Sequence, residues 1–220
     1  MKVFAIGDLH LSHQVEKPMD IFGGHWLGHA DKIEENWNTF VSPDDVVIIP
    51  GDFSWATYLA QAEEDFLFLD RLPGKKILLK GNHDYWWETV TKMKKYLDSI
   101  GVSTICFMYN NAVSAGGRVF CGTKGWDPEE EKDPVIINRE TSRFRASISD
   151  AGAGGDITAV FHYPPMNIPA LVSIMNEHGI RKCIFGHVHG IPQPQYWYER
   201  DGIEYLNVAA DRTDFCPVEI

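Results

Sequence analysis

The sequence has little cysteine and no long hydrophobic run, and each absence excludes a class of protein. Its four cysteines are scattered along 220 residues and form no CxxC pair. A disulfide framework and a thiolate zinc site are therefore not expected. No apolar stretch approaches the length that spans a membrane. The apolar run at the N-terminus is short and is interrupted by Asp8, so we expect no signal peptide and a cytoplasmic protein.

The chain is also short of positive charge. It has 20 lysines and arginines against 31 aspartates and glutamates, which gives a formal net charge of −11. Such a surface repels long polyanions and offers no basic footprint to duplex nucleic acid. A small anionic substrate is compatible with this charge if the site itself is positive, and bound metal ions would supply that charge locally.

Short apolar runs, rich in Val, Ile and Phe, alternate with helical patterns along the chain. Gly or Pro bounds the runs, which is typical of strands that are covered on both faces. In the first helical pattern, Ile33, Trp37 and Phe40 lie on one stripe, which predicts the buried face. We predict strands at 2–6, 46–49, 76–79, 158–161 and 182–185, and helices near 30–40, 57–71, 85–99, 135–149 and 168–178.

Two further pairs of apolar runs flank tight-turn signals and predict hairpins. Strands that alternate with helices, followed by hairpins, predict a layered α/β fold with mixed sheets. No linker divides the chain, so we expect one domain over residues 1–220. The predicted hairpins are 112–115 with 118–121 around Gly116-Gly117, and 196–199 with 203–206 around Asp201-Gly202.

Polar side chains follow all five predicted strands, at the point where each strand ends. In open α/β sheets this carboxyl edge is where ligands bind. Four of the five segments begin with Gly, which permits a sharp exit from the strand and a close approach of the backbone to a bound group. The segments are Gly7-Asp8-Leu9-His10, Gly51-Asp52, Gly81-Asn82-His83-Asp84, His162 and Gly186-His187-Val188-His189.

These residue types suit divalent manganese, iron or zinc, which accept imidazole and carboxylate ligands alike. Asp8 and His10 are two residues apart, and so are His187 and His189. Residues i and i+2 of an extended segment point to the same face, so each pair can aim both side chains at one cluster. Asp52 has two carboxylate oxygens and is a candidate to bridge two metal ions.

Together the five segments resemble the calcineurin-like metallophosphoesterase superfamily, whose pattern is DxH, GD, GNHD or GNHE, H and GHxH. The resemblance extends over nearly the whole chain. It implies a four-layer α-β-β-α sandwich, in which helices flank two mixed sheets and a dinuclear metal site lies at the carboxyl ends of the strands. It also implies two divalent transition-metal ions, one held by Asp8, His10, Asp52 and His189, the other by Asp52, Asn82, His162 and His187.

The same resemblance implies a reaction. A hydroxide that bridges the metals would attack phosphorus in line, with no covalent enzyme intermediate. His83 matches a histidine that contacts phosphate and protonates the leaving group. Asp84 would orient that histidine and favour its charged form. Neutral His and Asn ligands would leave the metal cluster positive, so that it attracts a phosphate ester despite the acidic surface.

One departure from the family pattern narrows the range of expected substrates. Protein phosphatases of this family follow the GD segment with an Asp-Arg pair, whereas Phe53, Ser54 and Trp55 follow Asp52 here. A phosphoprotein phosphatase is therefore not expected, and the chain is more similar to small bacterial phosphohydrolases and phosphodiesterases. The expected partner is a small phosphate ester. Whether it is a monoester or a diester, and which oligomer the chain forms, stays open.

Several tryptophans lie near these segments: Trp26, Trp55, Trp86, Trp87 and Trp126. The simpler interpretation, which we favour, is that they pack in the core or at its rim. The alternative is an aromatic wall that stacks a nucleobase or another flat leaving group. Such a wall predicts a preference for nucleotide-like esters.

Other polar residues can likewise be interpreted either as ordinary surface residues or as residues that contact the substrate. The arginines of the fourth predicted helix form either a solvated face, which we favour, or a grip on phosphate through paired contacts. These are Arg139, Arg143 and Arg145. The loop after the first ligand pair carries histidines that we expect at the surface, although one of them could touch substrate: His13, His25 and His29.

A non-catalytic function is the alternative to an enzyme. The superfamily also contains scaffold members in which the ligand positions are degraded, so an interaction module on the same fold has to be considered. Taken singly, an Asp or Asn after a strand is a common turn residue. Here all seven ligand positions and His83 are filled, which favours a phosphoric ester hydrolase.

Overall fold

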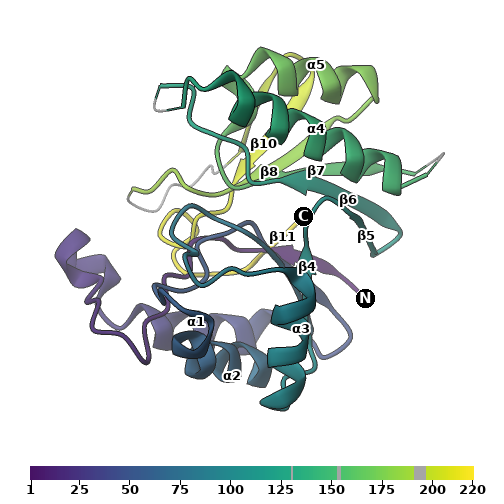
Figure 1. The fold of residues 1–220 in the computed structure, drawn as a ribbon. Helices are drawn as coiled ribbons and strands as arrows, with labels where there is room; N and C mark the ends of the chain where they lie inside the picture. Colours follow the sequence, from purple (N-terminus) through teal and green to yellow (C-terminus); the bar gives the residue numbers. More distant parts are fainter. Residues whose placement is uncertain (130, 153–154, 191–196) are drawn as a thin grey trace.

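The computed structural model describes residues 1–129, 131–152, 155–190 and 197–220. Two mixed sheets face each other in the middle of the molecule (Figure 1). The first sheet has the order β11-β1-β2-β3-β4, in which β11 is antiparallel to β1 and the others are parallel. Its strands are β1 (Val3–Ala5), β2 (Val46–Ile49), β3 (Lys75–Leu79), β4 (Ile105–Met108) and β11 (Val218–Glu219).

The second sheet has the order β5-β6-β7-β8-β10-β9. Its four central strands are parallel, and β5 and β9 are antiparallel strands at its edges. Both predicted hairpins, β5-β6 and β9-β10, are present, although Tyr196 of the second lies outside the described residues. The strands are β5 (Ala112–Ala115), β6 (Arg118–Thr123), β7 (Ile157–Phe161), β8 (Lys182–Phe185), β9 (Trp197–Arg200) and β10 (Ile203–Asn207).

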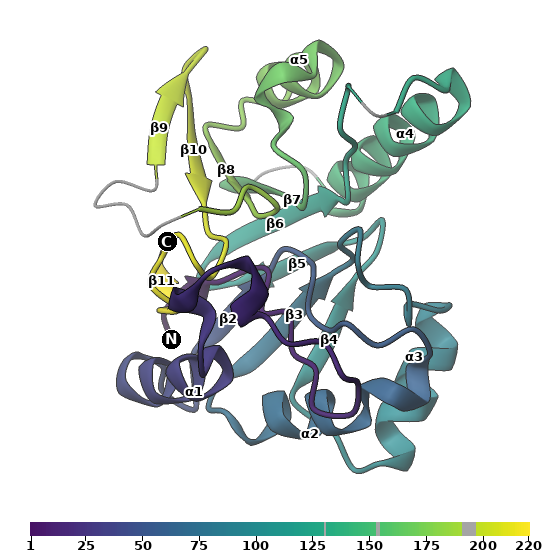
Figure 2. The ribbon, with the colours of Figure 1, turned by 90° about the vertical axis from the view of Figure 1, so that its left-hand side faces the viewer.

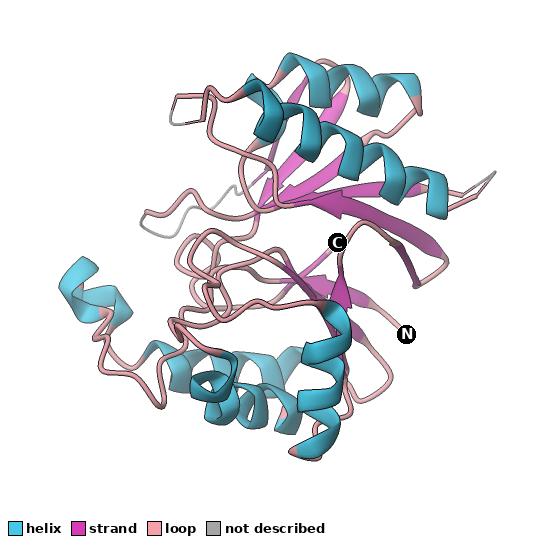
Figure 3. Cartoon of the chain, viewed as in Figure 1, coloured by secondary structure: helices cyan, strands magenta, loops and turns pink. Residues whose placement is uncertain are grey.

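Helices cover the outer face of each sheet, which makes four layers (Figures 1, 2 and 3). α1 (His29–Phe40), α2 (Glu63–Arg71) and α3 (Val90–Ser99) pack on the first sheet. α4 (Pro134–Asp150) and α5 (Pro169–Glu177) pack on the second. The predicted α-β-β-α sandwich is therefore confirmed. Short 3-10 helices lie at η1 (Asp20–Phe22), η2 (Gly24–Trp26), η3 (Leu59–Ala62) and η4 (Pro165–Asn167).

The residues of strand β2 form a continuous apolar run because both faces of the strand are buried. Val47 and Ile49 pack against the helices of the first sheet, whereas Val46 and Ile48 pack between the two sheets. Alternate side chains of a strand point to opposite faces, so a strand covered on both faces needs apolar residues throughout. The two sheets thus share a central hydrophobic layer that fixes their relative position.

The sequence predictions differ from the structure at several elements, and the helix predicted at 57–71 is an α-helix only from Glu63, after the 3-10 helix η3. β4 and β11 were not predicted, although all four residues of β4 are apolar; β11 has only two residues. The helix predicted from residue 85 begins at Val90 instead, since Trp86 is buried in the core and its indole donates to Asp84. The prediction that Phe40 is buried is wrong, because its side chain is 52% exposed at the end of α1.

No helix in the described ranges is long and apolar enough to cross a membrane.

Candidate metal centre

The residues that follow the strands turn sharply into one shared region between the two sheets. Asp8, His10, Asp52 and His187 all have positive φ, between 47° and 68°. This left-handed conformation costs a residue with a side chain roughly 1–2 kcal/mol. Strain of this kind persists where the surrounding structure enforces it, and it concentrates at functional sites. Four of the seven predicted ligands share it.

Two glycines allow these turns to pack closely. A Cβ at Gly81 would overlap the Asp52 carboxylate, and a Cβ at Gly186 would overlap the Asp8 carboxylate. Gly81 follows the first sheet and Gly186 follows the second. Only glycine therefore fits at either position, as the sequence pattern predicted from the close approach of the backbone.

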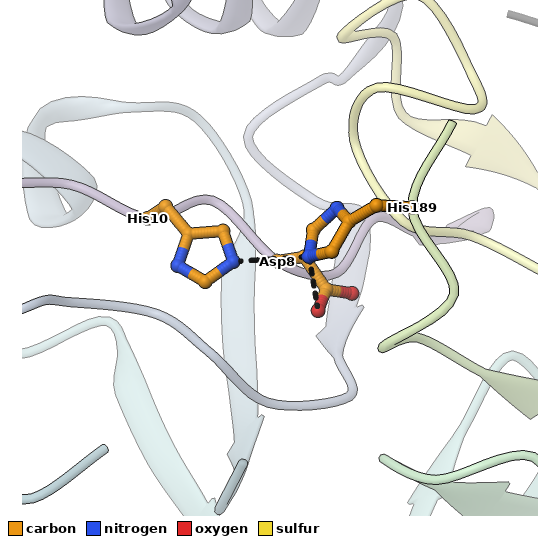
Figure 4. Close-up of side chains that lie close together, drawn as sticks. All are labelled: Asp8, His10 and His189. Atoms are coloured by element: carbon orange, nitrogen blue, oxygen red, sulfur yellow. Dashed lines mark hydrogen bonds and ion pairs between the residues drawn. The ribbon is translucent and has the colours of Figure 1, made fainter. Parts of the chain in front are cut away.

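The first cluster consists of Asp8, His10, Asp52 and His189. The Nε2 atoms of His10 and His189 lie 3.3 Å apart, and Nε2 of His189 lies 3.8 Å from Oδ1 of Asp8 (Figure 4). Oδ2 of Asp52 lies 3.8 Å from Nε2 of His10. Asp8, His10 and His189 present ligand atoms within 4.8 Å of one another, a spacing that a single metal ion can span.

The second cluster consists of Asp52, Asn82, His162 and His187. Oδ1 of Asn82 lies 2.5 Å from Nε2 of His162 and 3.0 Å from Nδ1 of His187. Oδ1 of Asp52 lies 3.6 Å from Nε2 of His162. Each oxygen of the Asp52 carboxylate therefore faces a different cluster, which is the arrangement expected of a bridging ligand.

The donor set fits two divalent cations. Burial raises the pKa of Asp8 and of Asp52 above the ordinary value, because charged carboxylates lose their hydration there. Burial also lowers the pKa of His162 to about 3 and of His187 to about 4, which keeps these imidazoles neutral. Oδ2 of Asp52 is buried and has no hydrogen-bond partner among the described residues. The neutral imidazoles of the second cluster and the unpartnered buried oxygen of Asp52 are groups that a metal cation stabilises.

A family model described as calcineurin-like phosphoesterase matches residues 1–190. The chain belongs to the calcineurin-like phosphoesterase family. As a member it is a phosphoric ester hydrolase with a metal-dependent reaction at a dinuclear centre, and the structure contains two candidate ligand groups, Asp8-His10-His189 and Asp8-Asp52-His162. Among curated proteins, none matches the chain.

Solved structures confirm the fold of this phosphoesterase. A phosphopantetheinyl hydrolase from Mycobacterium tuberculosis aligns with a TM-score of 0.63 and 15% identity, over 100% of this chain and 95% of that one. A protein from Thermus thermophilus aligns with a TM-score of 0.59 and 11% identity, over 94% and 88%. A protein of unknown function from Aquifex aeolicus aligns with a TM-score of 0.53 and 22% identity, over 99% and 95%. At these identities the likeness shows the fold alone.

The Asp84 carboxylate of the phosphoesterase organises the backbone around Asp52. It accepts hydrogen bonds from the backbone N–H groups of Asp52 and Gly81 at 2.9 and 2.7 Å, and from that of Phe53 at 2.9 Å. The indole of Trp86 donates to it at 3.0 Å. Burial, and then the Asp52 carboxylate, raise the pKa of Asp84 to about 7. These bonds hold the segment after β2 and the segment after β3 together.

Trp55, rather than Asp84, contacts the His83 ring. The two ring centroids lie 4.5 Å apart, and Trp55 also stacks on His10 at 4.8 Å. The described hydrogen bonds of Asp84 go to backbone amides and to an indole, so the expected contact between Asp84 and the His83 ring is not observed. The backbone N–H of His83 donates to Asp52 at 2.8 Å. The catalytic roles of His83 and Asp84 stay predictions.

A cavity of about 330 Å³ opens on the first cluster. Apolar and aromatic side chains form its walls, namely Met19, Phe22, Trp26 and Trp55. We call it the aromatic cavity. Among the predicted residues, His10, His83 and His189 also line it. The interpretation of Trp86 as core packing is confirmed, since it is 1% exposed and packs on Phe66.

Sequence reasoning missed Asp211 and placed His25 at the surface. Oδ1 of Asp211 lies 3.2 Å from Nδ1 of His189, and Oδ2 accepts from the backbone N–H of Gly190 at 2.8 Å. Burial lowers the pKa of His189, but Asp211, Asp8 and Asp52 outweigh it and raise that pKa to about 9. His25 lines the aromatic cavity, 4.0 Å from Asp211. Asp211 belongs to no sequence motif, because it comes near the metal centre only when the chain is folded.

Replacing Asp52 should affect both clusters at once. In Asp52→Asn one carboxylate oxygen becomes an NH₂ group, which cannot bind a cation. We expect the metal content of the purified protein to fall from about two equivalents to fewer than one, measured by inductively coupled plasma mass spectrometry. Asp127→Asn, which removes a carboxylate near His187 but outside both clusters, is the matched control and should retain its metal. Two retained equivalents in Asp52→Asn would contradict a bridging role.

Replacing Asp84 should destabilise the fold as well as the site. In Asp84→Asn an NH₂ donor would face backbone N–H donors, so we expect a loss of about 2–4 kcal/mol of unfolding free energy and a lower metal content. Denaturant melts and metal analysis measure both. Asp70→Asn is the control, because Asp70 accepts from Ser103 and Thr104 through one oxygen only. Wild-type stability in Asp84→Asn with an altered pH profile of turnover would instead support a role through His83.

Proposed function

We propose that the chain hydrolyses small phosphate esters at a centre of two divalent ions, one held by each cluster. The observation that carries this proposal is the Asp52 carboxylate, whose oxygens face His10 on one side and His162 on the other. Family membership supports metal-dependent phosphoester hydrolysis in general. The ligand assignment, the proton donor and the substrate class are the parts that we add.

The bound ions would neutralise phosphate charge and make a water molecule acidic enough to act as the nucleophile. The chain itself would supply the proton that the leaving oxygen requires. His83 lies beside the first cluster and lines the aromatic cavity, so its ring can reach an oxygen that leaves toward that cavity. Trp55 packs on the ring and limits its orientations. We therefore assign general acid catalysis to His83 and positioning of His83 to Trp55.

The aromatic cavity favours an ester with a flat, apolar leaving group. Trp26 is buried and its ring packs at steep angles to the rings of His10 and His189, while Trp55 stacks on His10. Aromatic side chains stack on flat groups with a gain of about 0.5–1.5 kcal/mol beyond area burial. Leaving groups such as nucleosides and aryl alcohols have this shape. We propose nucleotide-like esters as the substrate class on this basis.

The role of His83 can be tested by His83→Ala. We expect metal content to be unchanged and kcat to fall about 10²–10⁴-fold with alkyl leaving groups, because these alkoxides need a proton. With p-nitrophenyl leaving groups the loss should be much smaller. The assay uses purified protein with added manganese and a panel of phosphate esters. Loss of metal in His83→Ala would show that the assignment is wrong. Wild-type protein that binds no metal and turns over no ester would overturn the proposed function.

The role of the aromatic cavity can be tested with leaving groups of similar acidity. Methyl 2-phenylethyl phosphate and methyl butyl phosphate differ by a flat phenyl ring in place of an ethyl group, and release of each alcohol is measured. We expect the phenylethyl ester to be preferred in kcat/KM by about tenfold, and Trp55→Ala to abolish most of the preference. Trp55→Phe, which keeps a ring, is the control and should retain it. Equal turnover of both esters by the wild type would contradict this substrate class.

A further inference from the structure

A second cavity, of about 230 Å³, lies where β3, β4 and β6 end beneath α4. Its polar lining is basic. Lys80 follows β3, Lys124 follows β6, and Arg139 and Arg143 extend from α4. We call it the basic cavity. Four cations from three separate elements converge on it. This local positive charge contrasts with the net charge of −11 of the whole chain.

The negative charge in the basic cavity does not balance these cations. Glu140 is the acidic residue that lines it. Its buried carboxylate already accepts from Thr123 at 2.6 Å and from Arg143 at 2.5 Å, and Nε of Arg139 lies 3.8 Å away. Lysine ion pairs within the described part of the chain involve Lys2, Lys92 and Lys182, which leaves both lysines of the basic cavity without one. An anion would complete the site.

The basic cavity lies next to the second cluster. Lys80 is two residues before Asn82, so their Cα atoms are at most about 7.6 Å apart. The carbonyl oxygen of Lys124 accepts from the backbone N–H of His162 at 3.2 Å. The aromatic cavity, in contrast, opens on His10 and His189 of the first cluster. The two cavities therefore lie beside different halves of the metal centre.

We propose that the basic cavity binds a second phosphate group, carried by the part of the substrate that remains attached to the scissile phosphate after cleavage. This inference rests on the proposed function, in which the leaving group departs toward His83 and the aromatic cavity. The retained arm of a phosphodiester then extends the other way, over the second cluster. Arginine and lysine together suit a phosphate dianion, since Arg donates paired bonds and Lys adds a mobile charge.

Arg145, on the same helix, provides a comparison for the two arginines that line the basic cavity. It is bound by an ion pair to Glu177 of α5, at 2.9 Å, and it does not line the basic cavity. Arg139 and Arg143 differ, because both turn toward one buried carboxylate beside a cavity that also receives two lysines. A merely solvated helix face would not bring lysines from two strand ends to the same place.

Two substrates that differ by a single phosphate test this proposal. Thymidine 5′-(p-nitrophenyl phosphate) is compared with the same ester carrying a 3′-phosphate, using the metal-loaded protein, because the leaving group and the scissile diester are identical. We expect the 3′-phosphate to raise kcat/KM about tenfold. The double variant Arg139→Gln/Lys124→Gln should lose most of this ratio, and the control Arg145→Gln should keep it.

A binding measurement separates this inference from the proposed function. The metal-free protein is titrated calorimetrically with inorganic phosphate, and we expect binding that the double variant loses and Arg145→Gln retains. Equal turnover of the two esters by the wild type, or phosphate binding no tighter than in the double variant, would overturn the basic cavity as a phosphate site. If neither ester is turned over, the proposed function fails, and the titration alone decides the inference.

Discussion

The centre depends on the contact between the carboxyl edges of the two sheets. Asp8 follows the first strand of one sheet, yet both its oxygens accept the backbone N–H of His187 from the other, each at 3.0 Å. Nδ1 of His162 lies 3.0 Å from the carbonyl oxygen of Pro50, which joins the sheets a second time. Each cluster contains side chains from both sheets. The hydrophobic layer between the sheets is therefore a condition for the metal site as well as for stability.

The fold, and the meeting of the candidate ligands at one edge, could be predicted because both have local signals. Apolar runs bounded by Gly mark strands such as β2 and β8, and polar residues directly after them must meet at one edge once the strands are parallel. The glycines at 81 and 186 carry further information, since each leaves room for a carboxylate of another segment. The spacing of the segments alone does not say which ligands share a metal ion. The resemblance to the family suggested that assignment.

What could not be predicted depends on contacts between distant segments. Asp84 follows His83 in the chain, which suggested a direct contact, but its carboxylate turns inward to the backbone of the Asp52 segment. Asp211 meets His189 only because the chain returns to the centre after β10. Lys80 and Lys124 belong to no sequence motif. They line the same cavity only because β3 and β6 both end beside it, beneath α4. Tertiary structure creates these contacts, so no local pattern records them.

The distribution of charge explains how an acidic chain can act on an anion. Long-range repulsion from a net charge of −11 weakens over roughly 8 Å at physiological ionic strength, so a small substrate at the centre is governed by nearby groups. On one side the walls are mainly aromatic and apolar, with His189 and Asp211 at the metal centre, whereas on the other side four cations outnumber the acidic residue Glu140. Under the proposed function, a substrate with one apolar end and one anionic end would be oriented before any chemistry occurs. That orientation would decide which ester oxygen faces His83, and hence which bond breaks.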